Sequence, residues 1–295
     1  MHPYLLSCCS TADLTREQMA RRDIRYVCFH FTLDGEDYAD DMGQSITPAE
    51  LYTRMMAGAE VKTCQVPVAD YARYFAGLLD EGLDVLHVAF SGGLSGSVNA
   101  ARLAAEEVAP LYPDRRLMIV DSLGASTGYG LIMEPLADMR DEGMALDALR
   151  QWVEDNRLRM HSWFYSTDLS FCIRGGRISK TAGMAGTLLN ICPLLNMDAQ
   201  GKLKPREKLR GKKKVMQRIV EMMEAHAEGG LAYRGKCYIC HSMCDEDARA
   251  IADAVEARFP NLREPVGIYP IGATIGSHTG PGTLALFFWG DERTD

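Results

Sequence analysis

Short apolar runs alternate along the whole chain with longer stretches whose apolar positions recur at helical spacing. In the first half this pattern predicts strands over 4–9, 25–32, 84–89 and 116–121, and helices over 15–22, 48–57, 68–81 and 97–109. The second of these helices has a clear start, because Thr47 can cap it and Pro48 suits its first position. Strands and helices in this order are typical of an α/β protein with a largely parallel sheet flanked by helices.

The composition shifts after a predicted helix at 146–159, and we place a domain boundary there. The interpretation is an N-terminal α/β domain over 1–160 and a C-terminal α/β domain over 161–295. In the second domain, strands are predicted over 162–166, 236–241, 267–271 and 283–289, and helices over 215–227 and 246–258. An apolar region over 182–197 and a basic, hairpin-like segment over 201–214 precede these helices.

Two glycine-rich turns, 90–96 and 122–130, each follow a predicted strand and lead into a helix. Backbone N–H groups and the positive end of a helix meet at such a turn, at the carboxyl edge of a parallel sheet. Turns that follow neighbouring strands would form one crevice, and this crevice would stabilise an anion.

Composition and charge narrow the class of protein. With 295 residues, 47% of them hydrophobic, the chain can bury a substantial core, which excludes wholesale disorder. A net charge of -8 argues against a dedicated nucleic-acid binder. No apolar run is long enough to span a membrane and no export signal is recognisable, so we expect a cytoplasmic protein without stable membrane insertion. The nine cysteines then suit reduced thiols better than disulfides.

Three polar residues are candidates for binding. Ser95 lies at the start of the helix after the first glycine-rich turn, Thr63 precedes the helix at 68–81, and His278 lies in a glycine-rich segment, 276–282. Their hydroxyls and imidazole could add donors around an anion. Structural roles compete with this interpretation, since Ser95 and Thr63 could simply cap helices and a lone histidine is more often packed or solvated.

Several motifs together resemble the DegV family of bacterial fatty-acid-binding proteins. In chain order they are Ser10-Thr11-Ala12-Asp13-Leu14, Thr63 with Gln65, Leu94-Ser95-Gly96-Ser97, Val120-Asp121-Ser122, Gly175-Gly176-Arg177-Ile178-Ser179, Leu189-Asn190-Ile191-Cys192-Pro193-Leu194-Leu195, Lys208-Leu209-Arg210-Gly211-Lys212-Lys213 and Gly276-Ser277-His278-Thr279-Gly280-Pro281-Gly282. Each is weak alone, but they follow the family's order over almost the whole chain. One departure is clear, since Cys8-Cys9 stand where the family usually has Thr-Asp.

The resemblance implies two α/β domains with a fatty acid held between them, whose carboxylate is presented to a separate ATP-dependent acyl kinase. Carried over by motif, Thr63, Ser95 and His278 would bind the carboxylate, and Arg177 and Arg210 would face the head group or the kinase. The protein would then be a carrier without catalytic residues, metal or cofactor, with the fatty acid as its ligand.

The tail of a fatty acid needs an apolar slot, and burial of its methylenes would dominate affinity. The candidates are apolar residues of the region over 182–197, namely Met184, Leu188, Leu189, Ile191 and Leu194. Ordinary core packing is at least as good an explanation for any one of them.

Three other interpretations compete. A serine hydrolase is one, because Ser95, Asp121 and His278 occur in the chain order of α/β-hydrolase triads. Cys237, Cys240, His241 and Cys244 have a spacing that could suggest haem or zinc, although a strand would point alternate residues to opposite faces. The basic run over 202–214 is either a solvated face or a docking surface for an acidic partner or phosphate, with nucleic acid a distant third.

Overall fold

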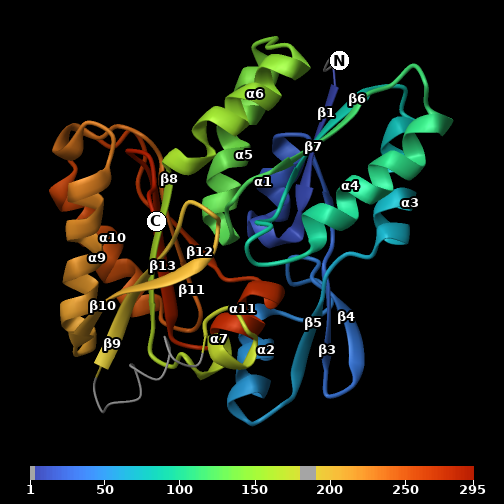
Figure 1. Cartoon of the computed structure of the whole chain (residues 1–295). Helices are drawn as coiled ribbons and strands as arrows, with labels where there is room; N and C mark the ends of the chain where they lie inside the picture. Colours follow the sequence, from blue (N-terminus) through green and yellow to red (C-terminus); the bar gives the residue numbers. More distant parts are fainter. Residues whose placement is uncertain (1–3, 180–190) are drawn as a thin grey trace.

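The computed structural model describes residues 4–179 and 191–295, and within these residues it has the predicted mixed α/β architecture (Figure 1). Four parallel strands form the N-terminal sheet in the order β2-β1-β6-β7. Their bounds are β1 Tyr4–Cys9, β2 Ile24–Val27, β6 Asp84–Ala89 and β7 Leu117–Asp121. β1, β6 and β7 match their predicted ranges to within one residue. β2 covers only the first part of the strand predicted over 25–32.

Helices flank this sheet, as parallel crossovers require. They are α1 Arg16–Arg21, α3 Val68–Leu79, α4 Ser97–Val108, α5 Ser126–Asp141 and α6 Leu146–Asn156. Helices α3 and α4 pack against each other and against β6. Helix α5 is different, because it contacts β1 of this sheet and also three strands of the C-terminal sheet. It therefore joins the two halves of the molecule.

Six strands form the C-terminal sheet in the order β10-β9-β8-β13-β11-β12, antiparallel except for the β11–β12 pair. The strands are β8 Met160–Ser166, β9 Ile191–Met197, β10 Leu203–Arg210, β11 Cys237–His241, β12 Gly267–Pro270 and β13 Thr283–Trp289. Helices α9 Lys212–His226 and α10 Asp245–Arg258 cover its outer face (Figure 1). The basic segment over 201–214, expected to be hairpin-like, is instead the single strand β10, paired antiparallel with β9, followed by the start of α9.

A small antiparallel sheet, β4-β3-β5, hangs below the parallel sheet in Figure 1. Its strands are β3 His30–Leu33, β4 Glu36–Ala39 and β5 Val61–Cys64. Helices α2 Pro48–Met56, α7 Ser170–Arg174 and α11 Ala273–Thr279 lie close to it. Short 3-10 helices lie at Ser10–Ala12, Ala109–Leu111, Arg157–Arg159 and Gly230–Ala232.

Three expectations from the sequence are wrong in this part of the molecule. The single strand predicted over 25–32 is two strands in two different sheets, and Thr63, for which we expected no strand, lies in β5. The segment 276–282 begins inside helix α11, whose N-terminus is held by the Asp40 carboxylate accepting from the backbone N–H of Thr274 at 3.1 Å. In each case long-range pairing overrides local composition, which favours neither β5 nor a helix rich in glycine and threonine.

Within the described residues, every strand up to Asp121 lies outside the six-stranded sheet and every strand from Met160 lies in it. One hydrophobic cluster nevertheless runs through both halves, from Leu6 of β1 to Phe287 of β13. A domain boundary near residue 160 therefore stays a prediction, and the two halves share one hydrophobic core. Among the helices of residues 4–179 and 191–295, none is long and apolar enough to cross a membrane.

Candidate functional site

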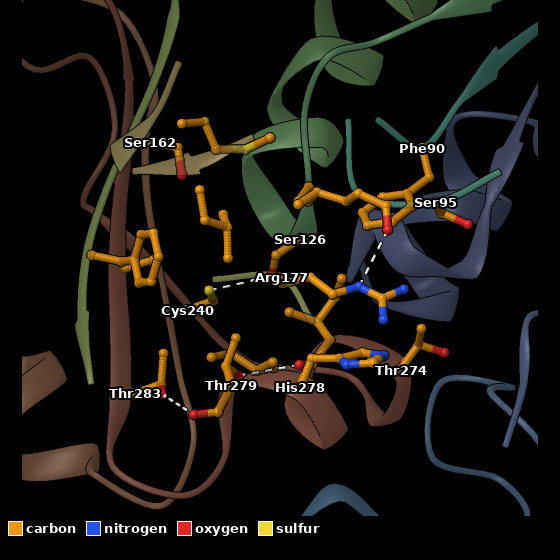
Figure 2. A pocket seen from close by; sticks show the side chains of 18 of the residues that line it. Phe90, Ser95, Ser126, Ser162, Arg177, Cys240, Thr274, His278, Thr279 and Thr283 are labelled. Atoms are coloured by element: carbon orange, nitrogen blue, oxygen red, sulfur yellow. Dashed lines mark hydrogen bonds between the residues drawn. The ribbon is translucent and has the colours of Figure 1, made fainter. Parts of the chain in front are cut away.

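A cavity of about 370 Å³ lies between the inner face of the six-stranded sheet and the carboxyl edge of the parallel sheet (Figure 2). Most of its wall on the sheet side comes from alternate positions of three neighbouring strands, with single residues from β9 and β10. These positions are Ser162 and Phe164 of β8, Thr283, Ala285 and Phe287 of β13, and Cys240 of β11. In the register of the sheet, Ala285 pairs with both Phe164 and Cys240.

The intervening residues of the same strands face the other way. Trp163, Tyr165, Leu284 and Leu286 pack in a second hydrophobic cluster with helices α9 and α10. Because successive side chains of a strand point to opposite faces, one sheet forms both the outer core and the wall of the cavity.

The two glycine-rich turns form the opposite wall, as predicted. They are linked by a hydrogen bond from Ser91 N–H to the Gly124 carbonyl at 3.1 Å. The first turn contributes Leu94 and Ser95 to the cavity, and the second contributes Ala125 and Ser126. The expectation of one crevice at the ends of neighbouring strands is therefore confirmed for β6 and β7.

Thr63, Ser95 and His278 all line this cavity, although they lie far apart in the sequence. The hydroxyl oxygen of Thr63 is 2.7 Å from Nε2 of His278, at hydrogen-bond distance. Ser95 Oγ accepts from the backbone N–H of Ser97 at 3.2 Å, so it supports the start of α4, and its O–H remains a potential donor. The N-cap of α4 is Gly96 and not Ser95, so this one bond to the start of the helix leaves Ser95 compatible with a binding role.

Arg177 lies between Ser95 and His278 in the view of Figure 2 and lines the same cavity. Its Nε donates to the Leu94 carbonyl at 3.2 Å and its Nη1 to the Gly175 carbonyl at 2.5 Å. Burial lowers the pKa of Arg177, which still stays charged at neutral pH. The polar corner of the cavity, formed by Thr63, Ser95, Arg177 and His278, thus contains a cation, which composition and spacing alone did not place there.

His278 is uncharged in this corner at neutral pH. Burial, followed by the nearby charge of Arg177, lowers the pKa of His278 to about 4. Its Nδ1 has no hydrogen-bond partner among the described residues. The imidazole therefore acts here as a neutral donor or acceptor beside a fixed cation.

This shift predicts a loss of stability in mild acid. In the unfolded chain a histidine takes up a proton near pH 6.5, whereas folded His278 stays neutral until about pH 4. The contribution of His278 is thus complete above pH 6.5 and is lost as the pH falls towards 4, roughly 1–2 kcal/mol between pH 7.5 and pH 5.

Chemical denaturation at several pH values, without ligand, tests this prediction. His278→Gln should reduce the fall in the free energy of unfolding over this range, whereas His30→Gln, at an exposed position of β3, should leave it unchanged. An identical pH dependence in His278→Gln and the parent protein would contradict the assignment.

Arg210 does not reach the cavity. Leu203, which begins β10, lines the cavity, but Arg210, which ends the same strand, is exposed and is not among the residues that line the cavity. The geometry therefore does not support a role of Arg210 at the head group, and its role in docking stays a prediction.

The predicted acyl slot also needs correction. Met184, Leu188 and Leu189 lie outside the described residues. Leu194 is fully buried in the outer cluster beneath α9, on the face of β9 that points away from the cavity. Ile191, at the start of β9, does not line the cavity either. Most of the wall comes instead from β8, β11 and β13, with Met197 of β9 and Leu203 of β10 beside them. Their apolar residues occur on both faces, so the sequence does not mark which face lines the cavity.

The competing catalytic and metal interpretations find no support in the geometry. Asp121 accepts hydrogen bonds from the backbone N–H groups of Gly92 and Leu123, and His278 pairs with Thr63, so Ser95, Asp121 and His278 form no triad. Cys237 packs in the outer cluster while Cys240 faces the cavity, so they cannot share one ion. All nine cysteines are free thiols.

Cys8 and Cys9 are the last two residues of β1 in the parallel sheet, where they are fully buried and do not line the cavity. The backbone N–H of Cys9 donates to the hydroxyl of Tyr129 at 3.0 Å, and its Sγ lies 3.3 Å from the hydroxyl of Tyr71. These residues thus belong to the packing of the sheet.

Fold and site together define an α/β protein with two sheets that enclose a largely apolar cavity with one polar, cationic corner. The family model described as "Uncharacterised protein, DegV family" matches residues 9–291. The chain therefore belongs to the DegV family.

Relatives and solved structures agree with this assignment. A DegV domain-containing protein of Clostridium perfringens is 33% identical over 293 residues, covering 99% of each chain. One from Lactococcus lactis is 32% identical over 278 residues, covering 94% of each. A structure described as "Fatty Acid Binding of a DegV family Protein from Thermus thermophilus" has a TM-score of 0.87 and 31% identity, covering 99% of this chain and 100% of that one. DegV of Bacillus subtilis, at 22% identity and a TM-score of 0.83, covers 99% and 100% and shares the fold.

Proposed function

We propose that this protein binds a long-chain fatty acid, with the tail in the cavity and the carboxylate at the polar corner. The observation that carries the proposal is the meeting, in one cavity, of an apolar sheet face with Thr63, Ser95, Arg177 and His278. The similar protein from Thermus thermophilus, described as fatty-acid-binding, supports it. The protein would be a carrier and not an enzyme.

The energetics of such a ligand favour this arrangement. Burying a sixteen-carbon tail at roughly 0.8 kcal/mol per methylene gains on the order of 10 kcal/mol before ordering costs. Removing the carboxylate from water opposes binding by several kcal/mol unless donors and charge compensate. The guanidinium of Arg177 and the hydroxyls of Thr63 and Ser95 would supply that compensation.

The contact between Thr63 and His278 suggests how the hydroxyl group of Thr63 is oriented. If Nε2 of His278 carries the proton, it donates to Thr63 Oγ1 across the 2.7 Å contact. The O–H of Thr63 is then free to donate to the carboxylate. His278 would act as a positioning residue that turns Thr63 towards the ligand.

Removing both hydroxyls should weaken fatty-acid binding. In the variant Thr63→Val with Ser95→Ala, we expect a dissociation constant on the order of 10- to 100-fold higher, because hydrogen bonds to a charged group contribute about 1.5–3 kcal/mol each and water replaces part of that. Titration calorimetry with palmitate measures it. Thr53→Val, at an exposed position of α2, serves as control. Unchanged affinity in the double variant would refute the placement of the carboxylate.

We further propose that the carboxylate is presented to a separate ATP-dependent acyl kinase. A second, more polar depression of about 430 Å³ shares Thr63, Arg177 and His278 with the cavity and adds Lys62 and Arg174. Glu60 also lines this depression and pairs with Lys62 at 2.8 Å, so its excess positive charge comes from Arg174 and Arg177. A carboxylate at the shared corner would thus face two guanidinium groups, suited to an incoming phosphoryl group.

Docking of the kinase would use the basic strand β10. Lys204, Arg206, Lys208 and Arg210 occupy its exposed alternate positions, in a chain whose net charge is -8. Such a local patch would attract an acidic surface of a partner. Charged edge strands also prevent aggregation, which is the simpler explanation of the same pattern.

Reversing one charge separates these two explanations. Arg210→Glu should lower kcat/KM for acyl phosphate formation by about 3- to 10-fold with the acyl kinase from the same genome, because rim charges act mainly on association rates. Palmitate affinity should not change. Arg102→Glu, at an exposed position of α4, is the control. Equal kinase rates for both variants would rule out docking through Arg210.

A further inference from the structure

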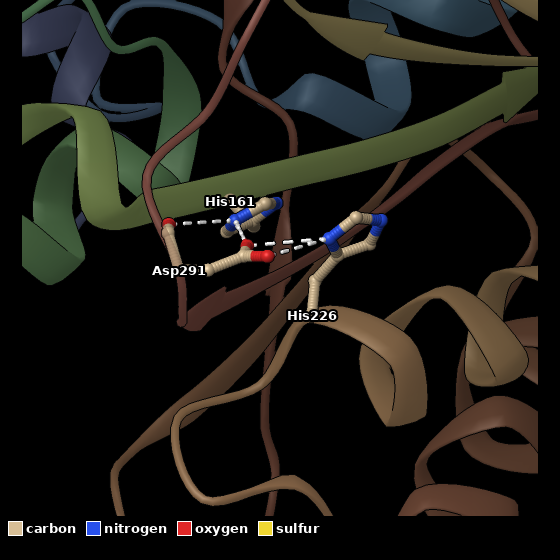
Figure 3. Close-up of side chains that lie close together, drawn as sticks. All are labelled: His161, His226 and Asp291. Carbon is tan, nitrogen blue, oxygen red and sulfur yellow. Dashed lines mark hydrogen bonds and ion pairs between the residues drawn. The ribbon is translucent and has the colours of Figure 1, made fainter.

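Two histidines and an aspartate converge on the side of the six-stranded sheet that faces away from the cavity (Figure 3). His161 lies near the start of β8, His226 is the last residue of α9, and Asp291 follows β13. Nε2 of His161 is 2.8 Å from Oδ1 of Asp291, and Nδ1 of His226 is 3.2 Å from the same oxygen. The potential ligand atoms of all three residues lie within 4.8 Å of one another.

The backbone holds these three side chains in place. The N–H of Asp291 donates to the His226 carbonyl at 3.0 Å, and the N–H of Gly290 donates to the Arg159 carbonyl at 2.8 Å. A side chain at Gly290 would collide with the His226 carbonyl, so glycine permits this close approach. The two imidazoles stack at 5.0 Å between ring centroids, and the His161 ring also stacks on Phe288 at 5.2 Å.

We propose that His161 Nε2, His226 Nδ1 and the Asp291 carboxylate bind a divalent transition-metal ion of the Zn²⁺ class. Two imidazole nitrogens with one carboxylate oxygen suit Zn²⁺ and its neighbours, whereas Mg²⁺ and Ca²⁺ prefer oxygen ligands alone. Bonds of about 2.0–2.2 Å to a tetrahedral ion place ligand atoms about 3.3–3.6 Å apart, so the 2.8 and 3.2 Å between Asp291 and the two histidines would lengthen by a few tenths of an ångström.

Exposure of the cluster leaves one side open. The side chain of His161 is only 4% exposed, but those of His226 and Asp291 are 34% and 59% exposed. Water would therefore complete the coordination. The positive charge of Arg293, close enough to influence His161, and the unpartnered Nδ1 of His161 both oppose binding. The affinity should thus be lower than that of closed four-ligand zinc sites.

The bound ion would join three elements of the C-terminal half, so the expected effect is on stability. Full-length protein is stripped with EDTA, dialysed and heated with increasing ZnCl₂ or MgCl₂. At a hundredfold excess over the dissociation constant, Zn²⁺ should raise Tm by about 3–6 °C, and Mg²⁺ should not. With Co²⁺, visible absorption bands should appear at one ion per chain.

Other side chains, such as the exposed Cys64, can also bind Zn²⁺ weakly. Variants of the cluster are therefore needed to assign the rise in Tm to these three residues. His226→Ala and Asp291→Asn should each weaken the Zn²⁺ response at least 10-fold and abolish the Co²⁺ bands. His30→Ala, at an exposed histidine of β3, should keep both. Palmitate binding, on the other face of the sheet, reports that each variant is folded. No saturable Zn²⁺ shift, or a shift that persists in both cluster variants, would overturn the proposal.

Discussion

Replacing Ala285 with phenylalanine is expected to reduce fatty-acid affinity about 100- to 1,000-fold. Ala285 lies at the centre of the cavity wall, between Phe164 and Cys240 in the sheet. A benzyl group there would take the place of about four or five methylenes of the tail, and each contributes roughly 0.8 kcal/mol. The expected loss is thus about 3–4 kcal/mol of binding free energy.

Because the new ring would fill an existing void, the fold should survive. We expect a free energy of unfolding without ligand that is equal to or higher than that of the parent protein. Displacement of a fluorescent fatty acid measures affinity, and denaturation measures stability. Ala257→Phe, at an exposed position of α10, is the matched control. Full affinity in a folded Ala285→Phe variant would show that the tail occupies another place.

Replacing Arg177 with glutamine should weaken binding of fatty acids by about 10- to 100-fold and of the corresponding fatty alcohols by less than about 3-fold. The guanidinium is held by the carbonyls of Leu94 and Gly175 at the polar corner. Hydrogen bonds to charged groups contribute about 1.5–3 kcal/mol, and only the carboxylate of the acid provides the opposite charge.

Comparing palmitate with hexadecanol in the same assay separates the charge effect from any change in the cavity. Arg102→Gln, at an exposed position of α4 that does not line the cavity, is the control. If both ligands lose affinity equally in Arg177→Gln, the substitution has altered the cavity, and Arg177 is not the counter-charge.

Much of the parallel sheet could be predicted, because each of its central strands is a continuous apolar run followed by a turn. Neighbouring parallel strands end at one edge, so the turns after β6 and β7 were expected to meet, and Ser95 was expected there. Thr63 and His278 are different. Their 2.7 Å contact joins residues 215 positions apart, and only the family resemblance placed both at one site.

The wall of the cavity could not be predicted from the pattern. Leu284, Ala285 and Leu286 form one apolar run, yet Ala285 faces the cavity and its neighbours face the helices. Where both faces of a strand are covered, alternation leaves no polar positions to mark the sides. The proposed slot therefore fell on a neighbouring apolar segment and included Leu194, which belongs to the outer core.

The amino-acid sequence by itself determined the order and type of the main elements, since these depend on local periodicity, turn residues and helix caps. It also placed polar residues at strand ends. Only the tertiary structure decided which sheet face encloses the cavity, that Arg177 lies beside His278 in the cavity while Arg210 does not line it, and that β5 forms a strand at all. The physical reason is that these features depend on contacts between distant segments, whose free energy outweighs local preference.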